Sequence, residues 1–274
     1  MHPENIGIAL ALSTFAGLST GIGSVLGVLG KSTNRRLLSA AMGFSAGMMV
    51  YVSLVELLPV AIESLGSSGS WGAWWALVAF LGGMGLIAVI DRFVPSPENP
   101  HEFPSAANGA SPRATEDASR GTGTNKLMRL GLMTTIVLAV HNFPEGIATL
   151  LAGLQSTEVG VPIALAVAIH NIPEGIAVAV PIHQATGNRW KAFGYSFFSG
   201  LAEPLGAIVG YALLMPFLTE VTFGLVYAAI AGIMVFISFD QLLPAAERYG
   251  EHHASTYGVV AGMLVMAASL IGLG

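Results

Sequence analysis

The sequence predicts an all-α polytopic membrane protein with eight transmembrane helices and inverted repeats. Of its 274 residues, 53% are hydrophobic and only 10% are charged, and the mean hydropathy is +0.69. A water-soluble domain carries about 25% charged residues. The apolar residues also fall into runs long enough to cross a bilayer, which takes about 20 residues per helix. Finally, every Lys and Arg lies in or beside alternate gaps between these runs. Soluble classes of protein are therefore excluded.

Eight apolar runs have the length of a membrane crossing. We expect helices near residues 6–30, 36–62, 71–94, 127–153, 159–183, 191–217, 221–246 and 254–273. No basic segment or cleavage site precedes the first run, so we expect no cleaved signal peptide. That run has glycines at small-xxx-small spacing, which allows helices to pack closely in lipid.

The distribution of positive charge predicts the orientation. All eleven Lys and Arg residues lie in or beside the gaps after the first, third, fifth and seventh runs, and the other gaps and both termini hold none. Under the positive-inside rule those basic gaps are cytoplasmic, and both termini lie outside. We therefore expect a multi-pass protein of the cell membrane, with the lipid bilayer as its surroundings.

The one long gap, at about residues 95–126, is rich in Pro, Ser, Ala, Gly and Thr. This composition is typical of a disordered linker, so we expect residues 1–274 to form a single transmembrane domain with one disordered cytoplasmic loop. His101 in this loop, and His252 with His253 in the last basic gap, could capture or relay a cation. Such residues in exposed loops are more often solvated polar sequence.

An eight-residue cassette occurs twice within the predicted membrane helices. His141-Asn142-Phe143-Pro144-Glu145-Gly146-Ile147-Ala148 recurs 29 residues later, from His170 to Ala177, with seven of eight positions identical. Residues four apart share one face of a helix, so the His and Glu of each copy point the same way, with Asn beside them. The two spans are antiparallel, so the repeat is inverted. Packing them together brings two imidazoles, two carboxylates and two amides to a common point.

A second repeat relates residues 46–61 to residues 231–246, with nine of sixteen positions identical. It also lies in antiparallel spans, and inverted repeats of this kind are typical of secondary transporters that bind substrate near the midplane. Glu56 and Asp240 within it either line an ion path or are structural acids near the span ends, and the sequence leaves both readings open. We interpret Ser53 and Ser238 as helix-packing hydroxyls.

The repeated cassette has the chemistry of a metal site. An ionisable side chain in a bilayer core costs roughly 2.5–3.5 kcal/mol on insertion scales, and a bound cation is the simplest compensation. The chain has no cysteine, so the ligands must be His, carboxylate, amide or Met. His nitrogen with carboxylate oxygen suits Zn²⁺ and also Fe²⁺, Mn²⁺, Co²⁺ and Cd²⁺. Glu203, followed by Pro204, fits as a further ligand. The alternative is that these groups only bond one another and hold helices together.

The two cassettes, the eight spans, the outside termini and the loop after the third span resemble the ZIP family of zinc and iron transporters. The resemblance covers essentially the whole chain. It implies a 3+2+3 arrangement of helices, a homodimer, and import of divalent metal ions into the cytoplasm by alternating access. The transported substrate would be Zn²⁺, with Fe²⁺, Mn²⁺, Co²⁺ and Cd²⁺ as further candidates.

The resemblance also implies a binuclear metal centre at mid-membrane. One site would consist of His141, Glu145, His170 and Glu174. The other would consist of Asn142, Asn171 and Glu203, with Glu145 and Glu174 bridging. In some family members the second cassette begins with Gln-Asp, whereas in this chain it begins with His170-Asn171. The change adds an imidazole to the first site and removes a carboxylate from the second, so we expect the second site to be weaker.

A membrane-embedded metalloenzyme, of the metallohydrolase or di-iron type, is the alternative function. Zinc proteases usually show His-Glu-x-x-His, and di-iron helical sites use Glu-x-x-His, whereas the cassettes read His-x-x-x-Glu. We therefore expect no enzyme activity, no catalytic cofactor and no nucleic-acid partner. A metal sensor is a third possibility, but the sequence shows no obvious output domain. The ligand set does not indicate which metal is preferred. It also does not distinguish passive transport from proton-linked transport.

Overall fold

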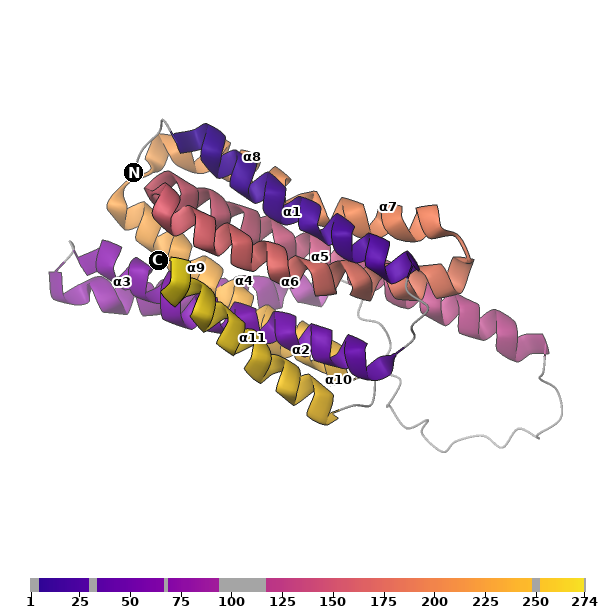
Figure 1. Ribbon diagram of the computed structural model, residues 1–274. Helices are drawn as coiled ribbons and strands as arrows, with labels where there is room; N and C mark the ends of the chain where they lie inside the picture. The colour runs from indigo at the N-terminus through magenta and orange to yellow at the C-terminus, as the bar shows by residue number, and fades with distance from the viewer. Residues whose placement is uncertain (1–4, 30–33, 67–68, 94–116, 248–251, 274) are drawn as a thin grey trace.

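The structure is a computed structural model that describes residues 5–29, 34–66, 69–93, 117–247 and 252–273 (Figure 1). These residues contain no strand, and they form eight helical segments long and apolar enough to cross a membrane. The predicted all-α fold class with eight spans is confirmed.

The eight crossings agree with the expected ones to within a few residues, except that the fourth helix begins ten residues earlier than the expected span. They are α1 (Ile6–Leu29), α2 with η2 and α3 (Arg35–Val52, Ser53–Leu57, Leu58–Gly66), α4 (Gly72–Phe93), α5 (Asp117–Gln155), α6 (Thr157–Thr186), α7 with α8 (Arg189–Gly200, Ala202–Leu214), α9 with η5 and α10 (Glu220–Ile237, Ser238–Leu242, Leu243–Glu247), and α11 (His252–Leu273). Two short 3₁₀ turns complete the described structure. The turn η3 (Gly69–Trp71) lies between the second and third crossings, and η4 (Met215–Phe217) ends the sixth crossing.

Helix α5 begins inside the segment for which the sequence predicts a disordered loop. Residues 117–126 belong to α5, which starts at Asp117. Residues 95–116 of the expected loop, with His101, lie outside the described residues.

Local sequence sets several helix ends. Ser156 caps α6 because its side chain accepts a hydrogen bond from the Val159 N–H at 3.2 Å, which satisfies one of the free donors of the first turn. Gly187 ends the same helix in the left-handed region, at φ +63°, where a residue without Cβ is favoured. Asn188 then caps α7 by accepting from the Lys191 N–H. The connection after the second cassette is therefore short and defined.

Proline residues act differently in different spans. Helices α5 and α6 continue through Pro144 and Pro173. The sixth span, expected as one helix, instead breaks at Leu201, just before Glu203 and Pro204, where the missing proline N–H removes a helix hydrogen bond. The break places Glu203 in the first turn of α8.

The second repeat has the same local irregularity in both copies. The five-residue π-helical turns η2 and η5 occupy equivalent repeat positions, each beginning at a serine and ending two residues before a proline. The Leu58 N–H donates to the Ser53 carbonyl, and the Leu243 N–H to the Ser238 carbonyl. This shared departure from α-helical bonding is strong support for a true internal repeat.

The helices divide into two bundles. The first bundle contains α1, α5, α6, α7 and α8, and the second contains α2, α3, α4, α9, α10 and α11 (Figure 1). The most extensive contacts lie inside the bundles, between α1 and α6, α5 and α6, and α5 and α8 in the first, and between α2 and α11 and α4 and α9 in the second. The boundary between bundles is formed mainly by α2 with α6, α5 with α9 and α6 with α11. Both termini lie at one end of the molecule (Figure 1).

Glycines bring the backbones together inside each bundle. A Cβ added to Gly146 would collide with the Glu203 carbonyl on α8, and one on Gly23 would collide with the Ile172 carbonyl on α6. In the second bundle, a Cβ on Gly47 would collide with α11, and one on Gly232 with α4. Gly47 and Gly232 are equivalent positions of the second repeat. The repeats thus pack their helices in corresponding ways.

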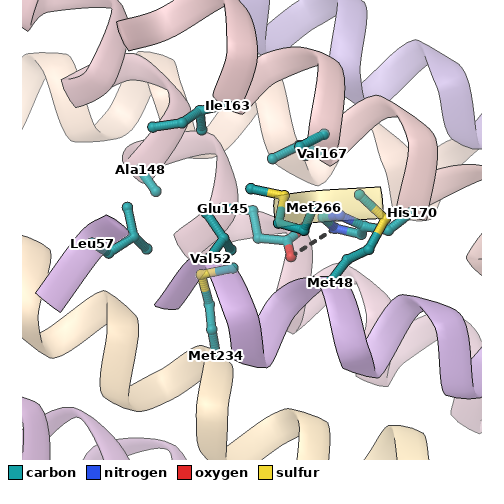
Figure 2. Close-up of a pocket in the computed structure, with 11 residues that line it drawn as sticks. Met48, Val52, Leu57, Glu145, Ala148, Ile163, Val167, His170, Met234 and Met266 are labelled. Carbon is teal, nitrogen blue, oxygen red and sulfur yellow. Dashed lines mark hydrogen bonds and ion pairs between the residues drawn. The ribbon is translucent and has the colours of Figure 1, made fainter. Parts of the chain in front are cut away.

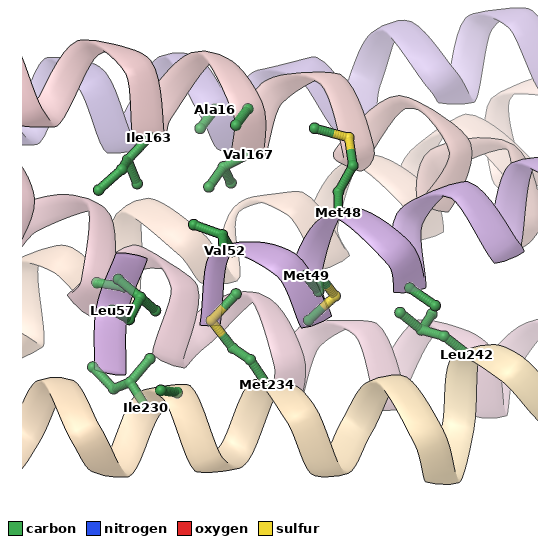
Figure 3. Close-up of a cluster of buried hydrophobic side chains, with 14 of the residues drawn as sticks. Ala16, Met48, Met49, Val52, Leu57, Ile163, Val167, Ile230, Met234 and Leu242 are labelled. Atoms are coloured by element: carbon green, nitrogen blue, oxygen red, sulfur yellow. The ribbon is translucent and has the colours of Figure 1, made fainter. Parts of the chain in front are cut away.

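Side chains, not glycines, fill the boundary between the bundles. Met48, Val52 and Leu57 of the second span face Ile163 and Val167 of α6, with Met234 of α9 beside them (Figure 3). This boundary lies directly beside the cassettes, which α5 and α6 carry in the first bundle.

Candidate metal centre

The two cassettes meet at the contact between α5 and α6. His170 Nε2 lies 3.1 Å from Glu145 Oε1, and His141 Nε2 lies 3.5 Å from Glu174 Oε1 and 3.6 Å from Glu145 Oε1. The four side chains are no more than 2% exposed. The helical spacing and the antiparallel packing therefore bring together the four residues of the first predicted site.

The amides and Glu203 lie around this group but are held by other helices. Asn171 Nδ2 donates to Glu203 Oε2 at 2.7 Å and to the Ala16 carbonyl of α1 at 2.9 Å. Asn142 Nδ2 donates to the Ser199 carbonyl of α7 at 3.1 Å. All three side chains are fully buried. The structure thus joins Asn171 to Glu203, whereas the hydrogen bond of Asn142 leads to α7 rather than to another candidate ligand.

Several buried atoms of these residues have no hydrogen-bond partner among the described residues. They are His141 Nδ1 and Nε2, Asn142 Oδ1, Glu145 Oε2, Asn171 Oδ1, Glu174 Oε2 and Glu203 Oε1. A buried polar atom left unpaired costs about 1–3 kcal/mol, and five of these seven are oxygens that can bind a cation. If these residues only held helices together, we would expect their mutual contacts to satisfy all of these atoms.

The two acids of the cassettes are paired with the two imidazoles. Glu145 and Glu174 are buried, and their described ion pairs are with imidazoles. The side chains contact one another directly, and across the described part of the chain no three His, Asp or Glu side chains form a ready group of metal ligands. A cation that binds here would therefore have to enter between the imidazoles and the carboxylates. It would then replace the imidazoles as the positive partner of the carboxylates.

Three contacts of this centre have no signal in the sequence. The carbonyls of Ala16 and Ser199 hold the two Asn side chains through their Nδ2 groups. Ser45 of α2 donates to Glu174 Oε1 at 2.7 Å. Each partner comes from a distant part of the chain, so only the tertiary structure reveals it.

A cavity of about 10 Å³ lies beside the centre at the bundle boundary, which is room for about one water molecule. Glu145 and His170 form part of its wall, and Met48, Met234 and Met266 line it from the second bundle (Figure 2). All its other lining residues are apolar. The centre is therefore closed on this side by packed side chains.

A larger cavity of about 380 Å³ lies nearer the end that holds both termini. It is lined by residues of both bundles, namely Val60, Glu63, Ser64, Gln155, Glu220 and Phe223. The two acids of its wall are exposed. Sequence reasoning did not single out these acids, although both are placed at the ends of predicted spans.

The remaining candidates lie at the periphery. Glu56 is partly buried in η2, and Asp240 is exposed in η5, so neither has the full burial of the cassette residues. His252 Nδ1 lies 3.2 Å from Glu247 Oε1, with the two side chains 73% and 57% exposed, which favours the solvated reading of this histidine. Ser238 bonds within its own helix, to the Met234 carbonyl, as expected for a packing hydroxyl.

Comparison with known proteins gives one consistent result. Residues 95–270 match the model of the family described as ZIP Zinc transporter. The chain is 53% identical over 270 residues to a protein of Streptococcus mutans named Zinc transporter ZupT, with 98% of each chain covered. Proteins with the same name from Corynebacterium efficiens and Chlorobium chlorochromatii are 53% and 51% identical, with 99% and 98% of each chain covered.

Proposed function

Because the chain belongs to the ZIP family of zinc transporters, we propose that it imports divalent metal ions through the centre between α5 and α6. The relatives are named as zinc transporters, and zinc is accordingly the proposed first substrate. The ions are the cargo of the protein, and they move by alternating access. Its eight spans make it a multi-pass membrane protein, and the basic ends of its helices are proposed to face the cytoplasm.

The observation that carries this proposal is the set of unpartnered atoms in the centre. Glu145, Glu174 and His141 each retain a buried atom without a hydrogen-bond partner among the described residues, beside imidazole and carboxylate contacts of 3.1–3.6 Å. Nitrogen with oxygen ligands suits Zn²⁺, and the same set accepts Fe²⁺, Mn²⁺, Co²⁺ and Cd²⁺. An arriving ion exchanges its water for these ligands.

A second, weaker ion position is proposed around Asn142, Asn171 and Glu203. Each of the three has one buried oxygen without a partner among the described residues, and Asn171 is already joined to Glu203. Amide oxygens carry no net charge and bind cations more weakly than carboxylates. This position is therefore proposed to assist transfer of the ion rather than to hold it tightly.

The division into bundles provides the means for alternating access. All seven candidate ligands belong to the first bundle, while Met48, Met234 and other apolar side chains of the second bundle lie over Glu145 and His170. Movement of one bundle against the other would open the centre while all seven candidate ligands stay in the same bundle. The larger cavity at the outer end is the proposed entrance, since it lies between the same two bundles.

The test is zinc uptake by proteoliposomes that contain the purified protein and a trapped zinc-sensitive dye. The double substitution Glu145→Ala with Glu174→Ala is expected to abolish uptake, because it removes both carboxylates of the first site. Glu158→Ala is the matched control, since Glu158 lies exposed in the first turn of α6. It should transport like the wild type.

Iron, manganese, cobalt and cadmium added as competitors would rank the substrates. Intact uptake by the folded double variant would contradict the proposal. Zinc bound by the wild type without any uptake would instead favour the metalloenzyme or the sensor.

A further inference from the structure

Ser45 of α2 makes a hydrogen bond that crosses the bundle boundary into the metal centre. Its hydroxyl lies 2.7 Å from Glu174 Oε1 and 3.4 Å from the His170 carbonyl oxygen, and the side chain is fully buried. Glu174 and His170 belong to α6, in the first bundle, whereas α2 belongs to the second. Ser45 thus links the two bundles at a candidate ligand.

The other described hydrogen bonds of the ligand side chains stay within the first bundle. Asn142 bonds to α7, Asn171 bonds to α1 and α8, and His170 bonds to Glu145 of α5. These bonds move with the ligands if the bundle moves as a unit. The bond from Ser45 would break when α2 and α6 separate.

The Ser45 hydroxyl donates to a carboxylate across the bundle boundary, whereas Ser13 and Ser196 donate to carbonyls of other helices within the first bundle. Ser24, Ser64 and Ser238 donate to the carbonyl four residues earlier in their own helices, which is the common arrangement. Ser45 instead donates across the boundary to a carboxylate. A hydroxyl that served only to fill space could donate to the carbonyl four residues earlier in its own helix.

We propose that Ser45 is a positioning residue that makes the metal affinity of Glu174 depend on the relation between the two bundles. With Oε1 held by Ser45, the other oxygen of the carboxylate, Oε2, has no partner among the described residues and is left to bind the ion. Hydrogen bonds to a ligating carboxylate fix its orientation, and losing such a bond typically weakens metal affinity about 10–100-fold. Separation of the bundles would free Glu174 to rotate and would release the ion.

This role rests on the proposed function, because it requires Glu174 to bind a transported ion. It adds a reason for release: the bundle movement that opens the centre also removes the group that orients one of its ligands. Affinity and access would then change together, although the same residues remain the candidate ligands.

The test compares Ser45→Ala with Ser238→Ala. Both serines are fully buried in the second bundle, but Ser238 donates to its own helix. Zinc affinity of the purified protein is measured by competition with a chelating dye, and KM and Vmax by uptake into proteoliposomes. For Ser45→Ala we expect the zinc Kd and the KM to rise about 10–100-fold, with Vmax retained because release is not slowed. Ser45→Thr, which keeps the hydroxyl, should restore most of the affinity.

Ser238→Ala should leave Kd and KM unchanged, and melting temperatures report whether each variant is folded. A wild-type Kd and KM in Ser45→Ala would overturn the role of Ser45, as would an equal loss in both serine variants. A wild type that neither binds nor takes up zinc would instead refute the proposed function from which this inference starts. The two failures are therefore distinguishable.

Discussion

The contacts inside the bundles differ in kind from the contacts between them. Inside, glycines such as Gly83 and Gly146 place one helix backbone against the next, so that no side chain separates them. Between the bundles, Met48, Val52 and Val167 pack against one another around a cavity of about 10 Å³ (Figures 2 and 3). Backbone contacts have one geometry, whereas flexible side chains such as methionine can repack. The molecule therefore combines close backbone contacts inside each bundle with side-chain packing at the boundary between them.

The candidate metal centre follows the same division. Its candidate ligands lie on α5, α6 and α8, which are joined at Gly146, Gly206 and related contacts of the first bundle. The second bundle supplies an apolar cover and Ser45. Backbone contacts thus hold the helices of the candidate ligands together, while side-chain contacts cover the centre at the bundle boundary.

The largest expected effect comes from adding a methyl group to a backbone contact inside a bundle. Gly83→Ala would place a Cβ against the Ala229 carbonyl on α9, and we expect it to lower stability by about 1–3 kcal/mol or more, as overpacking does. Its neighbour provides the control, since a Cβ on Gly82 meets nothing within 4 Å. Gly82→Ala should leave stability unchanged or raise it by up to ~1 kcal/mol, because alanine favours a helix.

Thermal unfolding of the two purified variants in detergent measures the difference. Equal melting temperatures would show that the backbone contact between α4 and α9 does not fix the second bundle.

The next effect concerns transport rather than stability. The chain has no cysteine, so introduced pairs can be cross-linked selectively. Val52 and Val167 both line the boundary cavity. We expect a cross-link between Val52→Cys and Val167→Cys to block zinc uptake almost completely. The cross-linker is a short bifunctional reagent that forms a disulfide with each cysteine. A reductant that cleaves the link should restore uptake.

A cross-link inside the first bundle serves as the comparison. Ser24 and Ser196 have hydroxyl oxygens 2.6 Å apart on α1 and α7, so Ser24→Cys with Ser196→Cys should form a disulfide without loss of uptake. Full transport by the cross-linked boundary pair would disprove movement between the bundles.

The smallest expected effect lies at the outer end of the boundary. Glu63 and Glu220 line the cavity of about 380 Å³, where acids raise the local concentration of cations. Glu63→Gln with Glu220→Gln should raise the KM for zinc by about two- to fivefold at low salt. The difference should shrink at high salt, since exposed charges are screened.

The measurement is uptake against zinc concentration at two ionic strengths. Glu158→Gln is the control, because this exposed acid does not line the cavity. The same KM change in the control would mean that overall surface charge, not the cavity, is responsible.

The sequence by itself determined the spans and the candidate ligands. Apolar runs and the placement of Lys and Arg predict eight crossings, since a bilayer imposes a fixed length on each helix. The 29-residue repeat of His141 to Ala148 predicts paired imidazoles and carboxylates, because helical spacing fixes which residues share a face. The antiparallel order of α5 and α6 then follows from their short connection, and the four residues of the first site meet as this geometry requires.

Only the tertiary structure decided which helices pack into the same bundle and which groups contact the candidate ligands. Ser45 lies 129 residues from Glu174 along the chain, and nothing in its local sequence marks it. The break at Leu201, the π turns η2 and η5, and the helical residues 117–126 likewise depart from the uniform spans expected. Periodicity describes one helix at a time, whereas bundle membership depends on the rotation and register of every helix against its neighbours, which single-span patterns do not contain.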